Sequence, residues 1–328
     1  MKDLITKLLI TGGAGFVGHH FVEHILKNTD WNVVVLDRLN YSGSLDRLRD
    51  INAFDSRRVL TLTADFTHPI AENLEQEIGE VDYIFHLGAE THVDNSITDP
   101  VRFVISNVLG TQHVIDFARR QKNLKKFFYF STDEVFGSIA KGFSAVNDPH
   151  NPSNPYSATK SGGEMLVKSA TNTYGLPAII TRTMNIIGER QHPEKFVPMC
   201  MNRILNGETV TIHSDKSKTK AGSRMYIHAR NVADGYMHLI GHGTIGKDYH
   251  IVGQEEIDNL ALARMIADIL GKELKYEMVD FHSSRPGHDL RYALSPISMT
   301  EIGWSPPKAF RDSLEKTLQW TINNPEWL

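Results

Sequence analysis

Short, almost continuously apolar runs alternate with helix-compatible stretches along the first half of the chain. The runs predict five strands, at residues 7–11, 31–36, 59–64, 81–87 and 126–130. Between them, the pattern predicts helices near 21–26, before Arg58, at 72–80 and over 100–120. Strands that are apolar throughout and alternate with helices indicate a parallel sheet covered on both faces. The predicted fold class is therefore α/β, with a doubly wound parallel sheet of the Rossmann type.

The alternation weakens past Ile186, and a smaller C-terminal lobe is expected from residue 189. It contains a predicted amphipathic helix at 260–270, a short strand at 274–279 and a closing helix at 310–323, with Leu314 and Leu318 at core spacing. We expect 1–188 to form the dinucleotide-binding domain, joined by 226–252. Residues 189–225 and 253–328 are expected to form the substrate-binding lobe.

The first strand runs into closely spaced glycines and then into a helix, which is typical of a phosphate-binding turn. The sequence there is Thr11-Gly-Gly-Ala-Gly-Phe-Val-Gly18. Gly12 and Gly15 allow the backbone to approach a pyrophosphate, and Gly18 lets the helix lie close to the sheet. Asp37, about twenty residues after the glycines, can accept both ribose hydroxyls and repel a 2′-phosphate. This favours NAD over NADP, although the neighbouring Arg38 could receive a phosphate.

Polar residues with catalytic potential follow the fifth strand. Ser131-Thr-Asp-Glu134 ends that strand, and Tyr156-Ser-Ala-Thr-Lys160 opens a predicted helix after a loop rich in Gly, Pro and Asn. Tyr156 and Lys160 are four residues apart and share one helical face, where the ammonium can lower the pKa of the phenol and hold a nicotinamide ribose. The combination indicates a dehydrogenase-type site.

Composition excludes several other classes of protein. The chain of 328 residues has 35 Lys and Arg against 39 Asp and Glu, without a basic block, so nothing points to nucleic acid or a membrane surface. One cysteine, Cys200, suits a reducing compartment, and no apolar run reaches spanning length, so we expect a cytoplasmic protein. His20 and His24 match an inverted zinc-protease pattern, but without a third ligand we expect surface histidines and no metal.

Taken in order, these motifs give the chain a family resemblance. It resembles the extended short-chain dehydrogenases/reductases that act on nucleotide sugars, and most closely the dTDP-glucose 4,6-dehydratases. The similarity spans nearly the whole chain, including 86–97, 107–111, 181–188, 193–198 and 285–292. Its most discriminating part is Thr132-Asp-Glu134, because related epimerases and decarboxylases usually lack the Asp-Glu pair.

The resemblance implies a role for each matching residue. In this family Tyr156 removes the C4 hydroxyl proton, Glu134 acts as base at C5, and a protonated Asp133 acts as acid to the leaving C6 hydroxyl. The implied catalytic residues are Thr132, Asp133, Glu134, Tyr156 and Lys160. The implied contacts to NAD, besides Tyr156 and Lys160, are Gly12, Gly15, Phe16, Val17, Gly18, Asp37, Asp65, Phe66 and Ala89. The implied contacts to the nucleotide sugar are His92, Asn185, Lys195, Arg224, Arg285 and His288.

The chain departs from the family around the nucleotide. Residues 213–228 lack the usual Gly-Asp-Gly turn and Arg-Asp-Trp, and Glu255 stands where an Asn is usual. A dTDP- or UDP-hexose therefore stays open as substrate, with UDP-glucose, a UDP-N-acetylhexosamine and a 4-epimerase activity as alternatives. A silent NAD-binding regulator is disfavoured by the intact catalytic residues. The resemblance also implies a homodimer, formed through the helices at 100–120 and 155–174.

Overall fold

The structure is a computed structural model that describes residues 5–280 and 291–328. These residues divide between two compact units. The first takes those in Met1–Val135, Asn154–Arg182 and Tyr236–Tyr249, and the second those in Phe136–Ser153, Thr183–Gly235 and His250–Leu328. The loop 136–153 thus belongs with the second unit, although it follows the strand that ends in Thr132. No helix in the described part of the chain has both the length and the apolarity needed to cross a membrane.

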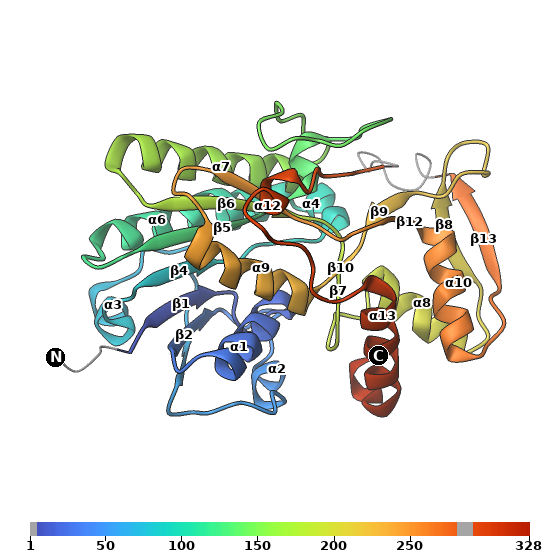
Figure 1. Ribbon diagram of the computed structural model, residues 1–328, viewed down its shortest axis with the longest axis horizontal. Coiled ribbons are helices and arrows are strands. Elements are labelled where there is room, and N and C mark those ends of the chain that lie inside the picture. The colour runs from blue at the N-terminus through green and yellow to red at the C-terminus, as the bar shows by residue number, and fades with distance from the viewer. Residues whose placement is uncertain (1–4, 281–290) are drawn as a thin grey trace. The chain divides into compact units, whose positions relative to one another are not determined.

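A seven-stranded sheet has the order β11-β6-β5-β4-β1-β2-β3, and most of its residues lie in the first unit. Figure 1 labels β6, β5, β4, β1 and β2 of this sheet. The strands are β1 (Lys7–Thr11), β2 (Asn32–Asp37), β3 (Val59–Thr63), β4 (Tyr83–His86), β5 (Lys126–Thr132), β6 (Ala178–Thr183) and β11 (Asp248–Ile251). β1 pairs in parallel with β2 and β4, β2 with β3, and β4 with β5. The chain winds outward from β1 and then restarts at β4, which confirms the predicted doubly wound fold.

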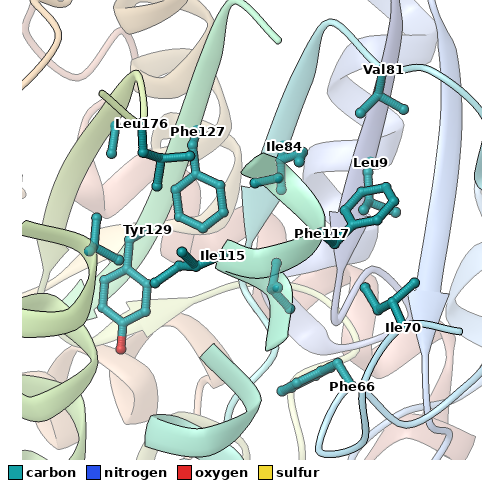
Figure 2. Close-up of a cluster of buried hydrophobic side chains, with 14 of the residues drawn as sticks. Leu9, Phe66, Ile70, Val81, Ile84, Ile115, Phe117, Phe127, Tyr129 and Leu176 are labelled. Carbon is teal, nitrogen blue, oxygen red and sulfur yellow. The ribbon is translucent and has the colours of Figure 1, made fainter. Parts of the chain in front are cut away.

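Successive side chains of each strand point to opposite sides of the sheet, so both faces are apolar. Helices pack on each of them. On one face, residues such as Leu9, Ile84 and Tyr129 pack with side chains of α3 (Glu72–Ile78), α6 (Gly110–Arg120) and α7 (Pro155–Tyr174); Figure 2 shows this cluster. On the other face, Phe85 stacks on Phe128 at 4.6 Å between ring centroids. Phe21 of α1 (Phe16–Asn28) meets Phe85 edge-on at 4.5 Å.

The stretch predicted as one helix over 100–120 is a continuous helical run with a π-helical turn in its middle. It consists of α5 (Pro100–Val104), η1 (Ile105–Leu109) and α6. Within the π turn, the Asn107 side chain accepts a hydrogen bond from the Glu90 backbone N–H at 2.8 Å and donates to its carbonyl at 3.0 Å. The wider turn therefore coincides with a side chain that fixes the loop after β4. Two short helices, α2 (Leu45–Arg49) and α4 (Val93–Thr98), complete this part of the chain.

The second unit combines three two-stranded pairings with helices. β7 (Ile186–Ile187) pairs with β10 (Ile227–His228), β8 (Val210–Ser214) with β13 (Tyr276–Asp280), and β9 (Ser223–Met225) with β12 (Glu256–Asp258). The helices are α8 (Phe196–Leu205), α10 (Asn259–Leu270), α12 (Ile297–Thr300) and α13 (Phe310–Asn323), with a 3-10 turn at η3 (Pro325–Trp327). α9 (Ala229–His242) runs from this unit into the first. Leu314 and Leu318 of α13 are fully buried, as their spacing in the sequence predicted.

Candidate active site

The turn between β1 and α1 has the geometry of a phosphate cradle. Gly12 has a φ of 70°, and a Cβ on it would lie 2.7 Å from the Cα of Gly88. A Cβ on Gly18 would overlap the carbonyl oxygen of Gly12. α1 begins at Phe16 and Val17, and its N-cap, Gly15, has no side chain to accept the first N–H groups. These donors suit a pyrophosphate, so the residues present fit a dinucleotide.

Asp37 ends β2 at the rim of this cradle. Its carboxylate accepts hydrogen bonds from the backbone N–H of Ala14 at 3.0 Å and of Leu39 at 2.9 Å. Burial raises the pKa of Asp37 above its ordinary value, and the two backbone donors oppose that rise. Arg38, in contrast, forms an ion pair with Glu90, whose side chain is only 1% exposed. A buried carboxylate therefore already pairs with the cation that could have received a 2′-phosphate.

The other predicted cofactor residues follow β3 and β4. Asp65 accepts a hydrogen bond from the Thr67 backbone at 2.9 Å. Phe66 is 4% exposed, and its ring meets His86 edge-on at 5.3 Å, so its side chain belongs to the core (Figure 2). Ala89 is half-buried directly after the β4 end. Because these residues all follow the carboxyl ends of parallel strands, they lie at the edge where such sheets bind ligands.

The five predicted catalytic residues gather at the end of β5 and the start of α7. Thr132 is the last residue of β5, and its hydroxyl donates to the Asp133 carboxylate at 2.9 Å. Asp133 and Glu134 form the first turn of η2 (Asp133–Phe136), and the Glu134 backbone N–H donates to Thr132 Oγ1 at 3.3 Å. Tyr156 and Lys160 lie one turn apart on α7, as predicted, and both are buried.

The electrostatics of Tyr156 and Lys160 are dominated by burial. Burial raises the pKa of Tyr156 well above its ordinary value, Glu134 and Asp133 add to the rise, and a hydrogen bond with Thr132 opposes it. Burial lowers the pKa of Lys160 to about 7, opposed by the charge of Glu164. The expected lowering of the phenol pKa by the ammonium is therefore outweighed here, because desolvation penalises the charged forms of both groups.

The Lys160 ammonium nevertheless has a defined position. Its Nζ donates to the Phe130 carbonyl at 2.6 Å and lies 4.3 Å from the centroid of the Tyr129 ring. A carbonyl and an aromatic face both favour a positive charge. Both contacts come from β5, so this strand fixes the position of the lysine side chain.

In the second unit, the predicted nucleotide-sugar residues are dispersed over several elements. Asn185 is exposed, and its carbonyl accepts from the Ile227 backbone at 3.1 Å. Lys195 caps α8 and lies 3.8 Å from Glu194. Arg224 donates to the Ser223 carbonyl at 2.7 Å, with its guanidinium 4.6 Å from the Tyr292 ring centroid. His92, in the first unit, caps α4. Arg285 and His288 lie outside the described residues.

Comparison with known proteins places the chain in a family. Residues 8–252 match the NAD dependent epimerase/dehydratase family. The chain belongs to this family. It is 37% identical to the low-salt glycan biosynthesis protein Agl12 of Haloferax volcanii, over 97% of this chain and 99% of that one. It is 35% identical to the dTDP-glucose 4,6-dehydratase of Salmonella typhimurium, over 98% and 94%.

A solved structure gives the same assignment. The dTDP-glucose 4,6-dehydratase DesIV of Streptomyces venezuelae, solved with NAD bound, superposes with a TM-score of 0.88 at 35% identity, covering 98% of each chain. Membership of the family confirms the expected cofactor, and the enzyme is NAD-dependent. When bound, NAD would be held by the cradle of β1 and α1, by Asp37 and by Lys160.

Two other residues singled out in the sequence, His20 and Cys200, are buried. The expectation that His20 is a surface residue is wrong: it is 1% exposed, lies on the buried face of α1 and packs against His19, with 4.0 Å between the ring centroids. Among the described residues, no group of three or more metal-ligating side chains occurs. Cys200 is buried, and burial raises the pKa of its thiol to about 12, so it carries no thiolate at neutral pH.

Sequence reasoning missed three residues that shape the site. Glu90 pairs with both Arg38 and Arg102, the latter at 2.7 Å. Tyr129 lies beneath the Lys160 ammonium. Asn154 caps α7 and donates to Glu134 at 3.2 Å. The signal for Asn154 was present, because an Asn before a Pro at a helix start is a typical N-cap. The partners of Glu90 and Tyr129 come from distant segments and leave no local pattern.

Proposed function

We propose that the protein is an NDP-glucose 4,6-dehydratase of the dTDP-glucose type, which produces an NDP-4-keto-6-deoxy-hexose. The observation that carries this proposal is the Asp133–Glu134 pair, located beside Thr132 and Tyr156 at the carboxyl end of β5. Oxidation at C4 needs only the tyrosine, the lysine and the cofactor. Elimination of water needs, in addition, two carboxyl groups in opposite protonation states.

Each residue of the cluster has a role in this reaction. Tyr156 takes the C4 hydroxyl proton, and Thr132 supports the oxygen at C4. Bound NAD supplies reversible hydride transfer, from C4 at the start and to C6 at the end. Glu134 removes the C5 proton that the 4-keto group has acidified, and the C5–H electron pair forms the C5–C6 double bond as the C6–O bond breaks. Asp133 gives its proton to the departing hydroxyl, which leaves as water. After hydride has been added at C6, Glu134 returns its proton to C5 and completes the 4-keto-6-deoxy product.

The first unit would bind NAD, and the second would bind the nucleotide of the sugar. Fixed cations and an amide suit a diphosphate, and Arg224, Lys195 and Asn185 offer them. The turn around Asp215 differs from the family pattern: Asp215 accepts from the backbone of Thr219 and Lys220, and three exposed lysines, Lys216, Lys218 and Lys220, surround it. Because this turn and the exposed Glu255 depart from the pattern of the dTDP-glucose enzymes, UDP-glucose or a UDP-N-acetylhexosamine is the second candidate substrate.

The experiment is a donor panel. Purified protein is incubated separately with dTDP-glucose, UDP-glucose and UDP-N-acetylglucosamine, with no NAD added, and each sugar is followed by mass spectrometry. Loss of one water from a single donor supports the dehydratase and fixes the nucleotide. A shifted retention time at unchanged mass would instead support a 4-epimerase. If none of the donors changes even with NAD supplied, the proposal fails for these substrates.

We also propose that the enzyme is a homodimer. Val101, Val104, Ile105 and Leu109 are between 42% and 64% exposed and recur at helical spacing along α5 and η1. Met165 of the neighbouring α7 is 46% exposed. An apolar stripe of this kind marks a protein–protein interface, and a second copy would cover it. The cytoplasmic location inferred from the single cysteine stays a prediction.

A further inference from the structure

Asn154 connects two parts of the catalytic cluster through one side-chain amide. It is 6% exposed and is the N-cap of α7. Its Oδ1 accepts from the Ser157 backbone N–H at 2.9 Å, and its Nδ2 donates to Glu134 Oε2 at 3.2 Å. The Asn154 backbone N–H also donates to Ser157 Oγ at 3.2 Å, which completes a capping box. The amide oxygen of Asn154 therefore accepts from a backbone N–H, and its NH₂ group donates to a carboxylate.

The cap fixes which end of the amide faces Glu134. Because a backbone N–H can only donate, the amide oxygen must face Ser157, and the NH₂ group must face the carboxylate. A donor to a carboxylate is stronger when the carboxylate is ionised, so it favours the ionised form. Ser, Thr or Asp would cap the helix as well as Asn does. Asn alone among these strong caps offers an NH₂ donor to Glu134.

We propose that Asn154 is a positioning residue for the elimination step, which holds Glu134 ionised and fixes it to the helix that carries Tyr156. The inference rests on the proposed function, because it assigns Glu134 the role of base. Among the charged and titratable groups near Glu134 are Asp133, on its own turn, and Tyr156, on α7. The charge of Glu134 helps to keep the Tyr156 phenol protonated, and the Asn154 Nδ2 donor stabilises that charge.

The test compares Asn154→Ser and Asn154→Asp with Ser157→Ala. The first two keep an N-cap, but Ser removes the NH₂ donor and Asp replaces it with a like charge. The third weakens the same helix end while leaving the contact between Asn154 and Glu134 intact. With the donor accepted by the wild-type protein, we expect water loss at neutral pH to slow about tenfold in Asn154→Ser and up to about a hundredfold in Asn154→Asp.

Two readouts separate this role from a general structural one. The acid limb of the rate profile should move to higher pH in both Asn154 variants, and reduced nicotinamide should accumulate, because C4 oxidation continues while elimination slows. Ser157→Ala should keep the wild-type limb. An unmoved limb in the Asn154 variants, or an equal shift in Ser157→Ala, would overturn the proposal.

A titration keeps the inference testable if no donor loses water. Glutamate carrying ¹³C at its side-chain carboxyl is incorporated, and the Glu134 resonance is assigned as the one missing from Glu134→Gln. Its titration midpoint should move to higher pH in Asn154→Ser and further in Asn154→Asp, with the melting temperature unchanged. A midpoint that does not move would refute the role of Asn154, whereas a wild-type protein inactive on all donors refutes only the proposed function.

Discussion

Lys160 is charged or neutral according to a balance between burial and two favourable contacts. Burial lowers its pKa to about 7 and the charge of Glu164 opposes that lowering, whereas the Phe130 carbonyl and the Tyr129 ring are the contacts that favour the ammonium. A desolvated cation–π contact is worth about 2 kcal/mol, which is more than one pKa unit. Loss of the aromatic ring under the lysine should therefore lower the fraction of enzyme that holds the charge at neutral pH.

Replacing Tyr129 tests this balance. Tyr129→Phe keeps the aromatic face and Tyr129→Leu removes it, so only the leucine variant should lower the fraction of charged Lys160. We expect turnover at pH 7.5 to fall about tenfold or more in Tyr129→Leu relative to Tyr129→Phe. Measured pH–rate profiles of the two variants, with NAD in excess, provide the check. Equal profiles would mean that the ring does not support the ammonium.

Among the elements, β1, β4 and α6 are joined through one buried histidine. His86 Nδ1 lies 2.7 Å from Thr11 Oγ1, and its Nε2 lies 3.0 Å from Thr111 Oγ1. Burial, with the charge of Lys160 as a smaller cause, lowers the pKa of His86 to about 3. The folded protein therefore keeps this imidazole neutral at pH values where the unfolded chain protonates it.

This difference predicts an acid-dependent loss of stability. Between about pH 6.5 and pH 3 the unfolded state binds one more proton at His86 than the folded state does. The free energy of unfolding therefore decreases as the pH is lowered through this range. Between pH 6.5 and 4 the contribution is about 3 kcal/mol. His86→Gln should be less stable at pH 7, yet should lose less stability on acidification. Urea unfolding at both pH values measures this, and identical losses in both proteins would contradict the assignment.

A buried ion pair joins β6 to α7. Arg182 and Glu164 both have fully buried side chains, and Arg182 Nε donates to Glu164 Oε1 at 3.0 Å. Arg182→Met leaves a carboxylate in the core without this cation and should cost about 3–5 kcal/mol. Arg182→Met/Glu164→Leu should recover part of that loss in urea unfolding. A double variant as unstable as the sum of the single changes would show that the two residues do not interact.

Buried polar residues such as Arg182 determine which strands could be predicted from the sequence. Strands with a largely apolar run, β1 to β5, were found from the pattern, as were α10 and α13. β6 was not assigned a strand, although all six of its residues are buried, because Arg182 and the threonines interrupt its apolar pattern. β11 is four residues long and contains Asp248 and His250. Polar residues can be buried there because their partners come from distant segments, which a local pattern does not reveal.

For the whole molecule, the chain crosses between the two units several times. Residues 136–153 belong to the second unit, so the strand and the helix that carry the predicted catalytic residues are separated in sequence by a segment of that unit. The predicted catalytic residues on either side of 136–153 were found from the sequence, because they belong to recognisable motifs. It could not find that Asn154 contacts Glu134, because loop length and composition do not specify how a chain returns.

The proposed dimer makes a separate prediction. Val101→Glu/Val104→Glu places two charges on the exposed apolar stripe and should convert the dimer to monomers, seen by light scattering coupled to size exclusion. Ile245→Glu, at a position that is 48% exposed and distant in sequence, is the matched control and should leave the assembly unchanged. A wild-type protein that is already monomeric at micromolar concentration would contradict the dimer.

We propose that Asp133 and Glu134 perform an elimination that Tyr156 and NAD only prepare. Glu134→Gln keeps the shape of the side chain and removes the base. Mixed with the donor that the wild-type protein dehydrates, this variant should accumulate reduced nicotinamide and release a sugar nucleotide that has lost no water. Water loss at the wild-type rate would show that Glu134 is not the base.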